Sequence, residues 1–95
     1  MRKKIAIIGS GISGLSAAYL LSKKYEVYLF EKNTRLGGHT RTIYVDDNLK
    51  KIPVDTGFIV FNEKNYPDLT KFFNLLKIDC RDSNMSFAVS NKLPD

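Results

Sequence analysis

The sequence predicts an α/β fold that starts with a parallel β-α-β unit, and three observations support this prediction. First, a short apolar run near the start of the chain leads directly into three spaced glycines, Gly9, Gly11 and Gly14. Second, the residues after Gly14 place apolar side chains on one helical face. Third, another apolar run ends at an acidic residue, Glu31. This order is typical of the first part of a Rossmann-like dinucleotide-binding domain.

The three elements of this unit follow one another along the chain. A strand is predicted over residues 4–8, because they form an apolar run that a glycine ends. A helix is predicted over 13–23, because apolar residues follow Gly14 at offsets of three, four and seven. The second strand is predicted over 26–30, another apolar run. Two strands joined by one helix in this way are expected to lie parallel.

The glycine turn is the predicted phosphate-binding element. Gly9 allows a tight turn out of the strand, Gly11 lets the backbone approach phosphates without an intervening Cβ, and Gly14 lets the helix pack against the strand. The first free N–H groups of the helix then point beyond the strand end, where they can bind a pyrophosphate. A strand-turn-helix without a ligand is the alternative. The residues expected to contact a dinucleotide here are Gly9, Ser10, Gly11, Ile12, Ser13 and Gly14.

Glu31 stands at the end of the second predicted strand, 17 residues after the last glycine of the turn. A carboxylate at this place can accept hydrogen bonds from the hydroxyls of an adenosine ribose. Because it would repel a phosphate on that ribose, its presence favours FAD or NAD over NADP as the dinucleotide.

The rest of the chain predicts a polar loop, a hairpin, a helix and one more strand. The loop is expected over 33–40, the hairpin strands over 41–45 and 51–54 around a turn at 46–48, the helix over 66–76 and the last strand over 85–90. Pro67 is tolerated in the first turn of that helix, whose apolar residues share one face. The residues considered for an apolar substrate cavity are Phe58, Phe61, Phe72 and Phe73, although core packing is preferred for the two in the helix.

Composition and charge exclude several classes of function. The net charge of +5 comes from basic residues spread along the chain rather than from a basic stripe. These residues are interpreted as solvated, and nucleic-acid binding is not expected. One histidine and one cysteine do not make a metal site. The single cysteine, Cys80, excludes an internal disulfide, and it is interpreted as a small buried hydrophobe rather than a reactive thiol.

The sequence predicts neither a signal peptide nor a membrane span, because the apolar stretch near its start is short and is interrupted by glycine. A cytoplasmic location is expected, since a single cysteine suits a reducing compartment. The 95 residues are interpreted as the N-terminal portion of a longer protein, because a Rossmann-like sheet needs further strands. Peripheral membrane contact through other parts of that protein, and its oligomeric state, stay open.

A second glycine motif follows the acidic residue and distinguishes FAD from NAD. Gly37 and Gly38 provide another close backbone approach, which an extended cofactor needs as it runs from its adenosine toward its flavin. With this motif the sequence resembles the flavin-containing amine oxidase superfamily, which includes protoporphyrinogen oxidases and phytoene desaturases. Within it, residues 55–62, 66–67 and 85–87 make the chain most similar to a bacterial subgroup described as predicted NAD/FAD-binding oxidoreductases. The residues that carry the resemblance are Gly9, Gly11, Gly14, Glu31, Arg35, Gly37, Gly38 and Thr40, followed by the segment 54–59.

The resemblance implies that residues 1–95 form the N-terminal portion of an FAD-binding Rossmann domain, in which about 41–95 lead toward the flavin and the substrate. It implies hydride transfer to the flavin from a small or lipid-like organic substrate. An NAD-dependent dehydrogenase and a non-catalytic dinucleotide-binding module are the alternatives. The further cofactor contacts that it implies, besides Glu31, are Lys32, Arg35, Gly37, Gly38, His39, Thr40, Thr56, Gly57, Phe58 and Ile59. Catalytic residues are expected beyond Asp95, so none is named.

Two positions depart from the pattern of the superfamily. His39 occupies the place of a second arginine, and Phe58 stands where a second glycine is frequent. Imidazole can still donate a hydrogen bond to a phosphate, so His39 is expected to contact the cofactor phosphates or the flavin. A solvated loop histidine and a general base are the alternatives. Phe58 argues against amine oxidation as the specific reaction.

Overall fold

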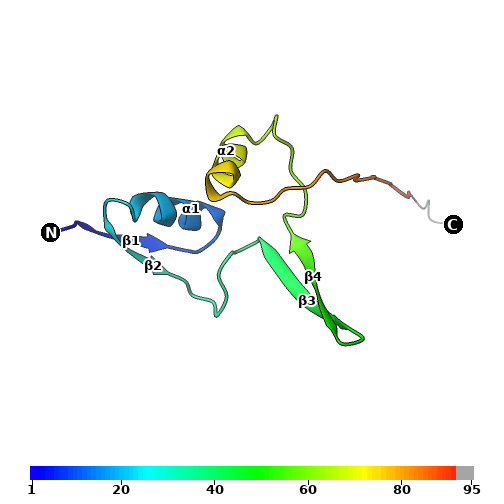
Figure 1. The fold of residues 1–95 in the computed structure, drawn as a ribbon, viewed down its shortest axis with the longest axis horizontal. Coiled ribbons are helices and arrows are strands. Elements are labelled where there is room, and N and C mark those ends of the chain that lie inside the picture. Colours follow the sequence, from blue (N-terminus) through cyan, green and yellow to red (C-terminus); the bar gives the residue numbers. More distant parts are fainter. Residues whose placement is uncertain (92–95) are drawn as a thin grey trace.

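The computed structural model of the chain describes residues 1–91 and begins with the predicted β-α-β unit. Strand β1 (Lys4–Ile8) pairs in parallel with β2 (Glu26–Phe30), and helix α1 (Ile12–Leu21) connects them, as Figure 1 shows. The ladder is in register over the full length of both strands. The predicted bounds of both strands are confirmed, and the helix begins one residue earlier and ends two residues earlier than predicted. The α/β class with a parallel start is therefore confirmed.

Two glycines explain how the chain passes from β1 into α1. Gly9 has a φ of +96°, a conformation that residues with a Cβ rarely adopt. A Cβ added to Gly14 would lie 1.9 Å from the carbonyl oxygen of Gly9. The first turn of the helix thus approaches the strand end more closely than any other residue type would permit, as predicted.

An antiparallel hairpin follows the unit and projects away from it (Figure 1). Its strands are β3 (Arg41–Asp47) and β4 (Lys50–Gly57), which are longer than predicted because pairing continues into their polar ends. Asn48 and Leu49 connect them, both with positive φ, as the tight turns of hairpins require. Every residue of β3 is exposed, so the ladder itself holds this region together.

The last regular element is helix α2 (Pro67–Leu76), which is close to the predicted range. Proline occupies its first turn, and Lys77 ends it in the left-handed conformation. The predicted apolar face is the half-buried face of the helix. The Phe72 ring packs edge to face against the Tyr19 ring of α1, with 5.8 Å between the ring centroids. The Phe73 ring packs in the same way against the Phe61 ring, with 5.2 Å between the centroids. Both helix phenylalanines therefore pack against other aromatic rings, as preferred for them from the sequence.

Two expectations about the later part of the chain are wrong. Residues 85–90 form no strand, and they are fully exposed. A strand needs a neighbour for its backbone groups, and the sheets among residues 1–91 contain β1 with β2 and β3 with β4 alone. Cys80, expected to be buried, is an exposed free thiol because it lies in the same extended segment.

The described residues are arranged openly rather than around one core. No apolar side chain among them is fully buried, and the single buried residue is Ser10. The radius of gyration is 18.3 Å, whereas a compact domain of this length has about 12 Å. Within the same residues, no helix has the length and apolar character needed to cross a membrane. Ser10 lies where the turn after β1 meets the loop after β2.

Candidate functional site

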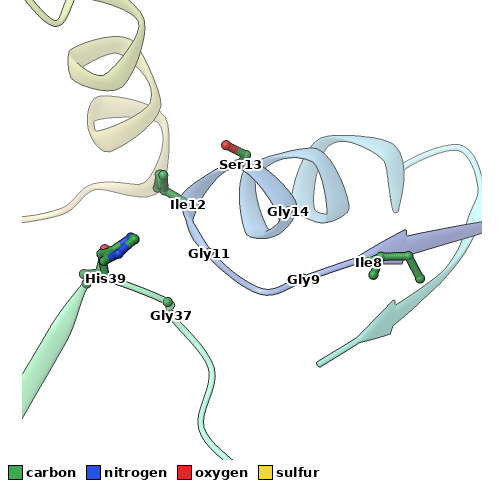
Figure 2. Close-up of a pocket in the computed structure, with 10 residues that line it drawn as sticks. Ile8, Gly9, Gly11, Ile12, Ser13, Gly14, Gly37 and His39 are labelled. Atoms are coloured by element: carbon green, nitrogen blue, oxygen red, sulfur yellow. The ribbon is translucent and has the colours of Figure 1, made fainter. Parts of the chain in front are cut away.

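The carboxyl end of β1 opens into a hollow of about 300 Å³. Its walls come from two segments, the turn between β1 and α1 and the loop that leads from β2 to the hairpin (Figure 2). The lining residues are Ile8, Gly9, Gly11, Ile12, Ser13, Gly14, Gly37, Gly38, His39 and Thr40. Ligands of open parallel sheets bind at this end of the strands.

The N-terminus of α1 faces this hollow with its backbone groups free of side-chain caps. Gly11 is the N-cap residue and offers no side chain to the first N–H groups, and the first turn contains no acidic residue. The first intrahelical bond runs from the Leu15 amide to the Gly11 carbonyl, at 2.9 Å. The preceding N–H groups and the positive end of the helix dipole are therefore suited to an anion.

Gly11 differs from Gly9, which has a positive φ, and from Gly14, where a Cβ would clash, because it has neither constraint. Its φ is −70° and its ψ −177°, which any residue can adopt. A Cβ added there would meet no atom within 4 Å. Neither the backbone nor the packing of the protein requires a glycine at this position, although Gly11 lines the hollow. A ligand that approaches the backbone would require it, so the geometry fits a bound pyrophosphate.

Glu31 is tied to the turn by Ser10. The amide of Ser10 donates to Oε2 of Glu31 at 2.9 Å, and the Ser10 hydroxyl donates to the same oxygen. The amide of Asn33 donates to Oε1 at 3.1 Å. The Ser10 hydroxyl, followed by these backbone N–H groups, lowers the pKa of Glu31 to about 2. The carboxylate at the end of β2 is thus ionised at neutral pH.

The glycine-pair loop, residues 33–40, is hydrogen-bonded directly to the phosphate-binding turn. The amide of Gly37 donates to the carbonyl of Ser10 at 2.8 Å. A Cβ added to Gly38 would lie 3.0 Å from the Cα of Gly11, so the two backbones are close to contact. Two glycine-containing segments, separated in sequence, therefore form opposite walls of one hollow. The close approach of the glycine pair to a cofactor stays a prediction.

Arg35 supports this loop through its guanidinium group. It donates to the carbonyl oxygens of Leu36, Gly38 and Thr40 at 3.1, 2.7 and 3.1 Å. These bonds direct its donors toward the loop that contains it, and Arg35 is not among the lining residues. Its observed contacts are therefore those of a residue that shapes the loop.

The structure brings most of the predicted contact residues together. Those that line the hollow are Gly9, Gly11, Ile12, Ser13, Gly14, Gly37, Gly38, His39 and Thr40. Ser10 is different, because it is fully buried and offers no surface to a ligand. Glu31 is half-buried beside the turn and Lys32 is exposed, and neither lines the hollow. Ile8 was not predicted, although its position directly before Gly9 places it there.

The segment 56–59 borders a second hollow. Gly57, Phe58 and Ile59 line this space of about 380 Å³, which shares Thr40 with the first. Its other aromatic lining comes from Phe61 and Phe73. Thr56 is not among its lining residues, and its hydroxyl donates to the Arg41 carbonyl. The predicted contacts thus fall into two adjacent spaces.

Gly57 is required by packing within the chain. A Cβ added to it would lie 1.9 Å from the carbonyl oxygen of His39. This close approach holds the end of β4 against the loop that lines the first hollow, whereas the sequence predicts a close approach to the cofactor. The imidazole of His39 lies beside the hollow, across from Gly11 and Ile12 (Figure 2).

These features define the chain as an α/β protein with a glycine turn of the dinucleotide-binding type. A family model described as an NAD(P)-binding Rossmann-like domain matches residues 7–76. The chain therefore belongs to the NAD(P)-binding Rossmann-like domain family.

Curated relatives support the superfamily that the motifs predict. The 4,4′-diapolycopen-4-al dehydrogenase of Metabacillus indicus is 67% identical over 36 residues, which are 37% of this chain and 7% of the relative. The 4,4′-diapophytoene desaturase of Staphylococcus aureus is 48% identical over 44 residues, 45% of this chain and 9% of the relative. Protoporphyrinogen oxidase 2 of Arabidopsis thaliana is 45% identical over 42 residues, 43% of this chain and 8% of the relative. The resemblance to the amine oxidase, desaturase and protoporphyrinogen oxidase superfamily is thus confirmed over this region.

Proposed function

We propose that the hollow at the strand ends binds the adenosine diphosphate part of FAD, and that the protein is an FAD-dependent oxidoreductase. The open space beside Gly11 carries this proposal, because a glycine stands there without a structural need for one. In the proposed complex the N-terminal amides of α1 bind the pyrophosphate and Glu31 accepts a hydrogen bond from the ribose. When bound, the flavin supplies the hydride-accepting group.

The glycine-pair loop favours FAD over NAD as the ligand. Its Gly37 is bonded to the phosphate-binding turn, and its Gly38 nearly touches Gly11, so the hollow has a second backbone wall. Such a wall lets an extended cofactor lie along the chain toward Thr40 and the second hollow. The relatives carry the names of a dehydrogenase, a desaturase and an oxidase, which are all oxidoreductases.

The substrate that we propose is a small or lipid-like organic molecule. Apolar side chains of the second hollow, including Phe58, Ile59 and Phe61, support this choice because they border the space reached past Thr40. One further relative is named 1-hydroxycarotenoid 3,4-desaturase, and its name describes an apolar substrate. We assign no catalytic residue, and we propose a cytoplasmic location because a single free cysteine suits a reducing compartment.

Identification of the bound nucleotide tests this function. The protein is expressed as its complete natural chain, its visible spectrum is recorded, and the nucleotide is released by denaturation and identified by chromatography. We expect a yellow protein that releases FAD and whose colour is bleached by a suitable organic substrate. Release of NAD without flavin would support a nicotinamide-dependent dehydrogenase instead. FAD that dithionite bleaches but no organic substrate does would support a non-catalytic module.

A further inference from the structure

Ser10 is the one fully buried residue in the part of the chain that the structure describes, and all its polar groups are used inside the protein. Its amide and its hydroxyl both donate to Glu31, which lies 21 residues further along the chain. Its carbonyl accepts from the Gly37 amide. One residue therefore connects the phosphate-binding turn, the end of β2 and the glycine-pair loop.

The two oxygens of Glu31 are used unequally. An ionised carboxylate has about four acceptor positions, two on each oxygen. Both donors of Ser10 converge on Oε2, so this oxygen has its full number of partners. Oε1 accepts from the Asn33 amide at 3.1 Å, and one of its two acceptor positions stays available. A ribose hydroxyl can bind at Oε1 while the contacts of Ser10 stay in place.

We propose that Ser10 is a positioning residue for sugar recognition, which holds Oε2 of Glu31 so that Oε1 accepts a hydrogen bond from one hydroxyl of an adenosine ribose. The inference rests on the proposed function, since it assigns the source of selectivity within the same site. Ser10 itself makes no contact with the nucleotide, because its side chain is buried. Without its hydroxyl, Oε2 has a free acceptor position and the carboxylate can rotate away from the ribose.

The test compares ADP with 2′-deoxy-ADP and 3′-deoxy-ADP by calorimetric titration of the cofactor-free full protein. A carboxylate that binds a ribose hydroxyl makes the affinity for at least one deoxy nucleotide about ten- to hundredfold weaker than for ADP, the scale of a hydrogen bond to a charged group. In Ser10→Ala we expect the ratio of the affinity for ADP to the affinity for that deoxy nucleotide to fall to about threefold or less. A loop that is merely loosened would weaken the binding of all three nucleotides equally and leave the affinity ratio unchanged. The affinity ratio therefore isolates the positioning role.

Two variants complete the measurement. Ser22→Ala is the matched control, because its hydroxyl donates to the Tyr19 carbonyl at the far end of α1 and its removal should leave the ratio unchanged. In a Glu31→Ala background, Ser10→Ala should have no further effect on the ratio, because the two residues act as one unit. Ser10→Cys keeps a weak donor of similar shape, so it should give an intermediate ratio even if the alanine variant does not fold.

The outcomes separate this inference from the proposed function. Failure of the wild-type protein to bind ADP would overturn the proposed function and the inference with it. Two results would overturn the positioning role alone while ADP still binds. In one, Ser10→Ala loses affinity equally for all three nucleotides, and in the other, the affinity ratio is unchanged in both Ser10 variants. A reduced ratio in Ser10→Ala, restored in part by Ser10→Cys, supports it.

Discussion

The β-α-β unit with its glycine-pair loop and the β3–β4 hairpin are held together in different ways. In the first region, bonds between distant residues converge on buried Ser10 and connect three segments of the chain. In the hairpin, nearly every residue is exposed and the contacts are those of a local ladder, with a side-chain bond from Thr42 to Asp55. The first hollow is formed where long-range bonds fix the backbone, and the hairpin packs against the loop that lines it through Gly57.

The same contrast exists between two neighbouring glycines of the turn. Gly14 is required by the protein, because a Cβ there would lie 1.9 Å from a backbone oxygen. At Gly11 an added Cβ would point into open space, and the backbone conformation is ordinary. A substitution at Gly14 should therefore damage the fold, whereas one at Gly11 should damage binding alone.

The largest effect is expected from Gly14→Val. The new side chain must displace the backbone at Gly9 or the first turn of α1, and overpacking of this kind costs about 1–3 kcal/mol or more. Thermal unfolding followed by circular dichroism should show a strongly destabilised protein, both with and without FAD. The matched control is Lys51→Val in the hairpin, which should change stability little because its side chain is exposed. Equal stability of Gly14→Val and wild type would contradict the packing assigned to α1.

Glu31→Ala should have the next largest effect and should act on binding. Loss of a charge-assisted hydrogen bond to the ribose should lower the affinity for FAD about ten- to hundredfold. FMN has no adenosine ribose, so its binding serves as the control in the same fluorescence titration. If FAD and FMN lose affinity equally, Glu31 supports the turn and does not bind the ribose.

His39→Ala should weaken FAD about three- to tenfold, the scale of one hydrogen bond to a neutral group, since His39 lines the hollow from one side. Titration with FAD measures the effect, and flavin reduction by a substrate at saturating FAD should stay close to the wild-type rate. A rate loss of about 10²–10⁴ with FAD fully bound would instead identify His39 as a general base. An unchanged FAD affinity would identify it as a solvated loop histidine.

The smallest effect is expected on the pH dependence of thermal stability, through the carboxylate of Glu31. The pKa of Glu31 is about 2 in the folded chain and near 4.5 without its partners. The ionised carboxylate therefore stabilises the fold above about pH 5, and this contribution is lost as the pH falls through 4.5 toward 2. Melting temperatures of wild type and Glu31→Gln should differ by a constant amount at neutral pH and converge in acid. A difference that persists to pH 2.5 would show that the bonds from Ser10 do not depend on the charge.

The parts of the site that follow from local rules could be predicted from the sequence. Both strands of the β-α-β unit and the steric roles of Gly9 and Gly14 depend on neighbouring residues, and the structure agrees with them. The burial of Ser10 could not be predicted, because serine in a glycine turn is usually solvated and its partner Glu31 is 21 residues away. The packing of Gly57 against the His39 carbonyl is equally non-local.

Two other differences have the same origin. Arg35 matches a superfamily position, but the direction of its guanidinium depends on the path of the loop, and it donates to three carbonyls of that loop. The pattern of residues 85–90 satisfies the local rule for a strand, while strand formation depends on a partner that the described residues do not place beside it. Sequence patterns therefore predict the elements of this site better than the contacts between them.

FAD binding by Gly11→Val is the most direct test of the central claim that the hollow between the two glycine segments holds the dinucleotide. The valine side chain enters space that the protein leaves open and a pyrophosphate would occupy. We predict a variant with the circular dichroism and thermal stability of the cofactor-free wild-type protein that no longer binds FAD, in contrast to the unstable Gly14→Val. A Gly11→Val protein that purifies with a full complement of FAD would contradict the account.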